Sequence, residues 1–443
     1  MPGTGGHPDP KHDLDTLVET IAAGDPETDL DALEHVDDRS RARDVSDADR
    51  EALLTFADEL AVRRTQTGYH RQTKLLRHCA IIAEETGLLA ESLDSERAAK
   101  RIVNWIHDAY HPDGGTRGTS EETNKDYRVA LKGFGRRVSS ENGDDPPDSM
   151  TWISSGLPSA YDPSPNPAEM LRWDEDVHPM LDACRSSRDR ALIALQMDAG
   201  LRSGELHHLR AGAFADSKYS LKLHVGSGKT GERSIDLIPS IPYVRKWLDD
   251  HPARHVADAP LWTTESSTPD DYNEIAYHSF YEVFERAALR ADVSKPYTPT
   301  NFRKSNAAWL ARTNAPQSFI EDRQGRTRGS EHIGRYVARF GPEAERVFAE
   351  LNGLDVESGD QPDRTGPIEC PRCARETPRH EPLCVFCGQA LSPSAAEDVD
   401  TAREDLFESV AETTDEETIA LLRQVHDAIE DDPEALADLI GDD

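Results

Sequence analysis

The strongest constraint on the fold is one alternating stretch set among helical patterns. The runs "SLKLHV" and "ERSIDLIP" alternate apolar and polar residues around the glycine-rich "GSGKTG", which is typical of two antiparallel strands joined by a turn. A nucleotide-binding phosphate loop would need a glycine where the chain has Leu223, and a helix after the lysine. We therefore expect a β-hairpin with Lys229 at its tip and no nucleotide cofactor. Taken alone, Lys229 would be a solvated lysine in a turn.

Helical patterns lie on both sides of this hairpin in the 443-residue chain. Apolar spacings of three and four follow Ser46, a good helix N-cap, and further helices are expected near 68–86, 94–110 and 120–138. Stretches rich in Pro, Ser, Asp and Gly indicate linkers. We expect a multidomain protein. In chain order its parts are an acidic and poorly ordered arm (1–45), an all-α unit (46–140), a linker (141–168), an α+β domain (169–352), a second linker (353–367), a cysteine-rich segment (368–391) and an acidic helical tail (392–443). The arm has a possible short helix around "LDTLVETIAAG", the α+β domain is mostly helical with a small antiparallel sheet at about 213–238, and the tail is expected to form one amphipathic helix at about 418–440.

The net charge of −34 is concentrated at the two ends of the chain. Residues 1–50 and 392–443 together contribute −25, so the residues between them are only weakly acidic. Lysine is scarce, with 11 residues against 39 arginines, and the composition resembles that of haloarchaeal proteins, in which an acidic surface maintains solubility in salt. No apolar run approaches 20 residues and the start has no secretory pattern. We expect a halophilic, cytoplasmic protein.

Two basic segments of the all-α unit contrast with this acidity. Residues 62–82 contain no Asp or Glu, and a second set of bases repeats every four residues along one helix face. Such faces are often only solvated, but in so acidic a chain they also indicate contacts with DNA phosphates. The candidate DNA-binding residues are Arg63, Arg64, Arg71, Lys74, Arg77, Arg128, Lys132 and Arg136.

Four of the six cysteines form the pattern C-x2-C-x10-C-x2-C. Paired thiolates at this spacing predict a structural Zn²⁺ site with the ligands Cys370, Cys373, Cys384 and Cys387, with an iron–sulfur cluster as the alternative. The segment resembles a zinc ribbon, which could bind either DNA or a protein partner. Its metal would supply the folding energy that so short a segment lacks. Cys79 and Cys184 are expected to be free thiols in the core.

Three residues from other parts of the chain place the hairpin lysine in a larger pattern. Arg202 lies in "DAGLRSGELHHLR", Arg303 in "YTPTNFRKSNAAWLA" and Tyr336 in "RQGRTRGSEHIGRYVARFG". In the order Arg, Lys, Arg, Tyr, the chain resembles the tyrosine recombinases, also called phage-type integrases, over about residues 46–345. The resemblance implies a site-specific recombinase that cleaves and rejoins double-stranded DNA as a tetramer, without a metal in the chemistry.

The resemblance also implies a role for each residue. Tyr336 would form a 3′-phosphotyrosine link, Arg202 and Arg303 would bind the scissile phosphate, and Lys229 would protonate the leaving 5′-oxygen. Arginine suits bidentate contact with phosphate oxygens, and cations favour the phenolate. Two positions differ from the family pattern, because Thr300 and Arg326 stand where a histidine and a histidine or tryptophan are usual.

These two differences leave alternatives open. Arg326 and Lys304 could donate to phosphate oxygens, and His332 is either a substitute proton carrier or a surface histidine. A catalytically weakened, DNA-binding relative of the recombinases is the second hypothesis. A third is an interaction adaptor that uses the cysteine-rich segment and acidic tail to bind a protein partner.

Overall fold

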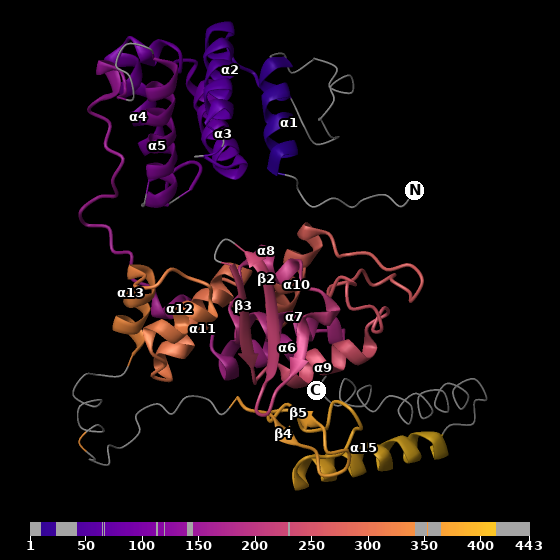
Figure 1. Cartoon of the computed structure of the whole chain (residues 1–443). Coiled ribbons are helices and arrows are strands. Elements are labelled where there is room, and N and C mark those ends of the chain that lie inside the picture. The colour runs from indigo at the N-terminus through magenta and orange to yellow at the C-terminus, as the bar shows by residue number, and fades with distance from the viewer. Residues whose placement is uncertain are drawn as a thin grey trace. The chain divides into compact units, whose positions relative to one another are not determined.

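The computed structural model divides the chain into two compact units, 1–163 and 164–443 (Figure 1). Each unit has its own apolar core. No helix in the described part of the chain is long and apolar enough to cross a membrane. The described residues are 10–23, 42–63, 65, 67–111, 114–118, 120–139, 145–228, 231–341, 352 and 365–412.

The first unit is built from helices. They are α1 (Pro10–Ala23), α2 (Asp47–Val62), α3 (Tyr69–Thr86), α4 (Glu96–Ala109) and α5 (Glu121–Val138), with short 3₁₀ turns at Glu91–Leu93 and Asp148–Met150. Ser46, Ser95 and Ser120 cap α2, α4 and α5 because each hydroxyl accepts a hydrogen bond from the amide three residues later. The four helices predicted between 46 and 138 are therefore confirmed.

Helix α1 lies in the arm expected to be poorly ordered (1–45), at the stretch "LDTLVETIAAG" where a short helix was considered possible. Leu14, Leu17 and Ile21 are buried, and they belong to the same core cluster as Phe56 and Leu76. These apolar residues repeat at intervals of three and four, so one face of a short helix can pack on α2 and α3. The expectation of poor order is therefore corrected for residues 10–23.

The expected linker at 141–168 is also wrong in part. Met150 and Ile153 are buried in the core of the first unit, and the Ser149 hydroxyl donates to the Ser92 carbonyl at 2.8 Å. The segment after α5 therefore folds back onto α4 and stabilises the helical unit. Proline and serine enrichment predicted an open chain but did not reveal these anchors.

The second unit surrounds a small sheet with helices. Its elements are a 3₁₀ turn (Pro167–Glu169), a π-helical turn (Trp173–Val177), α6 (His178–Asp182), α7 (Ser187–Ala199), α8 (Ser203–His207), a 3₁₀ turn (Ala211–Ala213), β1 (Phe214–Asp216), β2 (Leu221–Gly228), β3 (Gly231–Leu237), α9 (Ile241–Asp250), α10 (Tyr277–Arg290), α11 (Pro299–Arg312), α12 (Gln317–Arg323), α13 (Glu331–Phe340), β4 (Ile368–Glu369), β5 (Glu376–Thr377) and α15 (Pro393–Glu412).

The predicted hairpin is confirmed as strands β2 and β3. The sheet order is β1-β2-β3 and both pairs are antiparallel, with Leu223 opposite Ile235. Leu221, Leu223, Val225, Ile235 and Leu237 are all buried, because alternate side chains of a strand share one face. The fold class is confirmed as mostly helical with small antiparallel sheets.

The C-terminal part of the second unit holds the cysteine-rich segment and α15. Helix α15 at Pro393–Glu412 lies within the tail expected to be helical (392–443), but before the helix expected around 418–440, which lies outside the described residues. The other predicted domain boundaries stay predictions.

Candidate active site

Arg202 lies at the start of α8, directly after a sharp turn. The turn needs a left-handed backbone at Gly200, with φ of 61°, and a Cβ atom there would lie 2.4 Å from Asn306 Oδ1. Glycine is therefore required to bring α7 to α8 at this point. Arg202 is the N-cap residue of α8, and its guanidinium donates to Glu205 Oε1 at 2.7 Å and to the Gly325 carbonyl.

Glu205 and Arg233 hold Arg202 in place. The Arg233 guanidinium donates to Glu205 Oε1 at 3.1 Å and to Oε2 at 2.8 Å, and both side chains are about nine-tenths buried. Burial opposes the charge of Glu205, but hydrogen bonds from Arg233 and Arg202 lower its pKa to about 2. Sequence reasoning missed Arg233. The sequence could have indicated Arg233 only through its position in β3. Alternate residues of a strand share one face, so Arg233 lies on the same face as the buried Ile235 and Leu237.

Arg303 lies on α11 and is 7% exposed. Its two terminal nitrogens donate to the carbonyls of Gly200 and Gln324, both at 2.7 Å. Burial, together with the nearby charges of Arg326 and Arg202, lowers its pKa to about 9. The three arginines therefore lie within electrostatic reach of one another.

Arg326 lies in the loop after α12 and connects the arginines to the phenol. Its Nε donates to Gln324 Oε1 at 2.8 Å. Burial and the charge of Arg202 lower the pKa of Arg326, whereas Tyr336 raises it. This residue stands where the sequence resemblance led us to expect a histidine or tryptophan.

Tyr336 lies on α13 and is 2% exposed, in a small core with Ile320 and Ile333. Burial raises the pKa of its phenol to about 12, while the positive charge of Arg326 opposes the rise and Glu169 adds to it. The structure therefore brings together Tyr336, Arg326, Arg202 and Arg303, which together span more than 130 positions of the sequence.

His332 is a member of this cluster and not an isolated surface histidine. Its ring meets that of Tyr336 edge to face, with the centroids 5.4 Å apart. Burial, followed by the charges of Arg326, Arg335, Lys304 and Arg303, lowers its pKa to about 4. At neutral pH the ring is uncharged beside the phenol. Lys304 is half-buried nearby, whereas Thr300 is exposed.

The hairpin lysine was expected to complete the site. Lys229 lies outside the described residues, but β2 and β3 on either side of it are described, with Gly228 opposite Gly231. Arg233 on β3 contacts Glu205 of α8, and it lies two residues after Gly231, so the turn end of the hairpin is anchored to the arginine cluster. The combination of a phenol with several arginines can bind and polarise an anion with tetrahedral oxygens, such as a phosphate diester.

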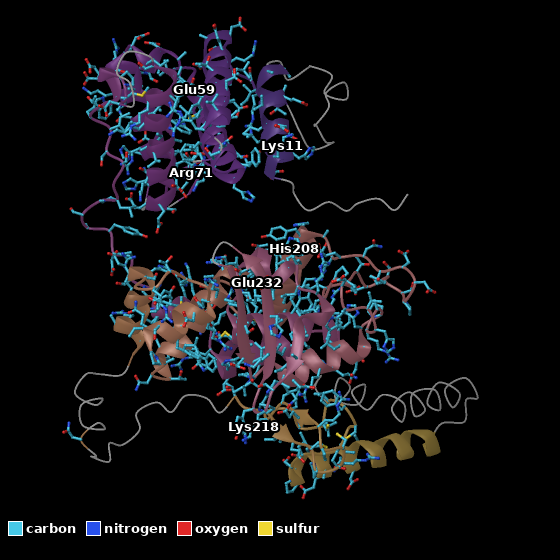
Figure 2. The ribbon with its side chains drawn as sticks, viewed as in Figure 1. Lys11, Glu59, Arg71, His208, Lys218 and Glu232 are labelled. Carbon is cyan, nitrogen blue, oxygen red and sulfur yellow. The ribbon has the colours of Figure 1, made fainter. Side chains whose placement is uncertain are left out.

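The candidate DNA-binding residues of the first unit separate into two groups. Arg71, Arg77 and Arg136 are exposed (Arg71 is labelled in Figure 2). Lys74 pairs with Asp126, and Arg63 lies 3.9 Å from Glu59. Arg64 lies outside the described residues.

Arg128 and Lys132 are instead used inside the unit. Arg128 is 6% exposed, and its guanidinium donates to Asn124 Oδ1 and to the carbonyls of Ser154 and Gly156. Lys132 donates to the Ile153 carbonyl at 2.9 Å. The expected phosphate contact of Arg128 is therefore corrected to a structural role, because the returning segment after α5 covers it.

The four clustered cysteines converge on one point. Cys370 Sγ lies 3.7 Å from Cys387 Sγ, and Cys373 Sγ lies 3.7 Å from Cys384 Sγ, with all four within 4.8 Å of one another. A tetrahedral ion with Zn–S bonds of about 2.3 Å would need edges of about 3.8 Å. The two Cys-x-x-Cys turns have the same backbone hydrogen bond. The Ala374 amide donates to the Cys370 carbonyl, and the Gly388 amide donates to the Cys384 carbonyl. The donor set and its spacing fit a tetrahedral metal site. Cys79 and Cys184 are buried free thiols, as expected.

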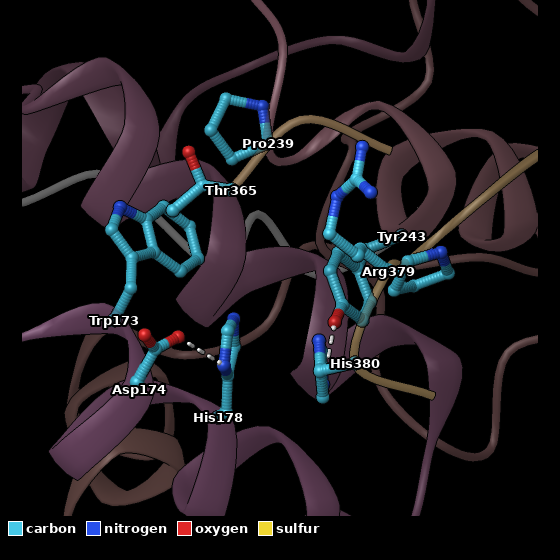
Figure 3. A pocket seen from close by; sticks show the side chains of 9 residues that line it. Trp173, Asp174, His178, Pro239, Tyr243, Thr365, Arg379 and His380 are labelled. Atoms are coloured by element: carbon cyan, nitrogen blue, oxygen red, sulfur yellow. Dashed lines mark hydrogen bonds and ion pairs between the residues drawn. The ribbon is translucent and has the colours of Figure 1, made fainter. Parts of the chain in front are cut away.

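The cysteine-rich segment packs against α6 and α9. A pocket of about 260 Å³ lies at this contact (Figure 3). The rings of His178 and His380 stack with centroids 3.7 Å apart, and the Tyr243 hydroxyl lies 3.3 Å from His380 Nε2. Ion pairs of Arg245 with Glu376 and of Arg375 with Asp249 border the contact. The segment is thus seated on the α+β domain.

Comparison with known proteins matches residues 173–340 to the phage integrase family. No curated protein sequence matches the chain. Among solved structures, XerH site-specific recombinase bound to palindromic difH substrate has a TM-score of 0.47 and 16% identity, covering 70% of this chain and 98% of its own. Lambda integrase bound to DNA has a TM-score of 0.46 and 16% identity, covering 66% and 98%. The Tn1549 transposon integrase in complex with transposon right end DNA has a TM-score of 0.45 and 13% identity, covering 68% and 98%. The family match assigns residues 173–340 to a phage integrase domain.

Proposed function

We propose that this protein is a site-specific DNA recombinase that cleaves and rejoins DNA through a 3′-phosphotyrosine on Tyr336. The observation that carries the proposal is a cluster of three arginines, one of which, Arg326, acts on the buried phenol of Tyr336. Arg326 acts electrostatically on Tyr336, and both Arg202 and Arg326 act on Arg303. Like charges held this close raise the free energy of the empty site. A bound phosphate relieves that repulsion.

The cleavage step follows from this arrangement. The Tyr336 oxygen attacks the phosphorus, the bond to the 5′-oxygen breaks, and the phenolic proton is released. Arg202 and Arg303 bind the non-bridging oxygens, and Arg326 stabilises the phenolate. Loss of one such donor typically lowers a rate by about 10²- to 10³-fold. Lys229, at the hairpin tip, protonates the leaving 5′-oxygen, and attack by another 5′-hydroxyl reverses the step and rejoins the strand.

The proposed partner is double-stranded DNA, engaged by a homo-tetramer. Arg71, Arg77 and Arg136 of the first unit offer exposed cations for the phosphate backbone, and Lys74 and Lys132 are half-buried beside them. Phosphate contacts weaken steeply with salt. In a salt-rich cell, base contacts and DNA shape must supply much of the binding, so we expect a defined target sequence.

The four cysteines are proposed to bind a structural Zn²⁺ ion as a zinc ribbon. The Cys370, Cys373, Cys384 and Cys387 thiolates would complete its tetrahedron, and the ion would supply folding energy and take no part in strand cleavage. Its seating on α6 and α9 supports a role within the chain. Arg372 and Arg375 belong to this segment, so a DNA contact of the zinc ribbon remains the alternative.

A second candidate function is sequence-specific DNA binding without turnover. It is favoured by the exposed Thr300, which cannot carry a proton near neutral pH, and by the burial that raises the pKa of Tyr336. The two candidates differ in one product. Only the recombinase forms a covalent protein–DNA species.

A nicked duplex pool with randomised sequence tests the proposal. Cleavage beside the nick releases a short strand, so the covalent intermediate accumulates and survives detergent. We expect wild type and the matched Tyr297→Phe control to form this adduct and Tyr336→Phe to form none. DNA that is retained by wild type without any covalent product would support the second candidate and overturn the first.

A further inference from the structure

A second group of metal-binding side chains lies at the far end of α8 from Arg202. His207 ends α8 and His208 follows it, while Glu274 comes from a segment 66 positions later (His208 is labelled in Figure 2). A bridge between Thr263 and Glu274, and the hydrogen bond from the Ile275 amide to the Trp262 carbonyl, fix that segment beside α8. The three side chains therefore belong to two separately anchored pieces of backbone.

Three ligand atoms form a small triangle. His207 Nδ1 lies 3.2 Å from His208 Nδ1, His208 Nδ1 lies 3.3 Å from Glu274 Oε2, and His207 Nδ1 lies 3.9 Å from Glu274 Oε2. Zinc bonds to nitrogen and oxygen are about 2.0–2.2 Å long, so one face of a zinc tetrahedron has edges of about 3.3–3.6 Å. The two edges at His208 Nδ1 are close to this length, and the edge of 3.9 Å between His207 Nδ1 and Glu274 Oε2 is slightly longer, so a small movement of the Glu274 side chain would complete such a face.

The orientation of His207 is set by its surroundings. Its Nε2 lies 2.8 Å from the Ile275 carbonyl, and this contact assigns the proton to Nε2 and the lone pair to Nδ1. The ring is 4% exposed and meets Tyr277 and Phe280 edge to face, with centroids 5.2 and 5.1 Å away. Metal-binding histidines usually donate their other N–H to a carbonyl or carboxylate in this way.

We propose that His207, His208 and Glu274 bind a second Zn²⁺ ion through His207 Nδ1, His208 Nδ1 and Glu274 Oε2. The fourth position faces outward, because His208 and Glu274 are about one quarter exposed, and water fills it. Two imidazoles and one carboxylate are a common zinc donor set. The ion joins the C-terminal end of α8 to the 274–275 segment, and so fixes the helix whose first residues hold Arg202.

The other histidine-containing cluster of the described residues is weaker. It combines Asp182, His380 and Glu381, but His380 Nε2 lies 3.8 Å from each carboxylate, the Asp182 side chain is 58% exposed, and Nε2 already faces the Tyr243 hydroxyl. We therefore assign the second ion to His207, His208 and Glu274.

Counting zinc in the full-length protein tests the proposal. We expect two ions per chain in wild type, one in Cys373→Ser, and one in both His208→Ala and Glu274→Gln after dialysis against a weak chelator. His255→Ala, an exposed histidine away from the cluster, is the matched control and keeps two. Loss of one ligand should weaken the second ion by at least about 100-fold. Glu274→Gln preserves the side-chain size, and an unchanged far-UV spectrum shows that each variant is folded.

Cobalt substitution identifies which site has been lost. The cysteine site gives a strong thiolate-to-cobalt absorption, whereas a site of two histidines and a carboxylate does not. His208→Ala should keep the thiolate band and lose only the weaker ligand-field bands. One zinc per wild-type chain, or two zincs in both His208→Ala and Glu274→Gln, would overturn the proposal. One zinc per wild-type chain would mean that His207, His208 and Glu274 are held together by hydrogen bonds without a metal ion.

Discussion

At the scale of single residues, the main feature is positive charge held close together inside the protein. Arg303 is buried and donates to two backbone carbonyls, which fix its position without neutralising it. Arg202 and Arg233 share the carboxylate of Glu205. The cluster therefore combines one strong internal anion with several cations, and a DNA phosphate would supply the missing negative charge.

Replacing Glu205 by Gln tests this balance. The folded-state pKa of Glu205 is about 2, below its ordinary value of 4.5, so its contribution to stability is full above pH 4.5 and is lost as the pH falls towards 2. The shift corresponds to about 3 kcal/mol. We expect the unfolding free energy of Glu205→Gln to be lower by roughly that amount at pH 6, and the two proteins to converge near pH 2. Denaturant unfolding at several pH values measures this, and parallel wild-type and variant curves would contradict it.

The sequence predicted some of these residues better than others. Arg202 and Arg303 were expected near helix starts and Tyr336 in a short helix rich in arginine, and their order along the chain carried the resemblance. Arg233 could not be predicted, because a charge on the buried face of a strand is visible only once the strand and its register are known. The prediction that Arg128 contacts DNA was wrong. The periodicity of α5 placed Arg128 on one face of the helix but did not show that the segment after α5 covers that face.

At the scale of elements, α1 is part of the first core. Its apolar residues Leu14, Leu17 and Ile21 are buried with those of α2 and α3. A short acidic helix has little stability by itself. Packing of its apolar face against α2 and α3 therefore keeps α1 helical.

Truncating Ile21 measures how strongly α1 is held. Its side chain is fully buried, so we expect Ile21→Ala to lower the unfolding free energy of the first unit by about 2–5 kcal/mol. Lys11→Ala, on the exposed side of α1, should change it by less than about 0.5 kcal/mol. Equal effects of the two substitutions in urea unfolding would mean that α1 is not packed.

The exposed face of α3 is tested by salt dependence. Each phosphate contact contributes about 0.9 to the slope of log affinity against log salt. We expect Arg71→Ala and Arg77→Ala each to reduce the slope by about that amount, and the exposed Arg97→Ala on α4 to leave it unchanged. Binding to duplex DNA across a salt series gives the slope. Identical slopes in all four proteins would remove α3 from the DNA interface.

Elements with strong periodicity were predictable, while those stabilised by distant contacts were not. Helices α2 to α5 and the hairpin followed from local patterns and caps. Helix α1 and the anchors at Met150 and Ile153 depend on burial against segments far along the chain. Composition favoured an open chain for both segments, because it records polarity and not the few apolar residues that make the contact. The apolar spacing near α1 left a short helix possible but did not show that the helix is packed.

At the scale of the whole molecule, each part has a separable role. The first unit presents exposed arginines, the integrase domain gathers the phenol and the arginines, and the cysteine-rich segment packs on α6 and α9. The acidic ends of the chain carry most of the negative charge. This separation explains how a protein with a net charge of −34 can present positive surfaces to DNA.

The most direct measurement is to identify the atom that becomes bonded to DNA. The covalent adduct from the nicked duplex pool would be digested with nuclease and trypsin and sequenced by mass spectrometry. The account predicts a nucleotide on the Tyr336 oxygen, within the peptide that follows Arg335. A nucleotide on any other side chain, His332 included, or an adduct that persists in Tyr336→Phe, would contradict it.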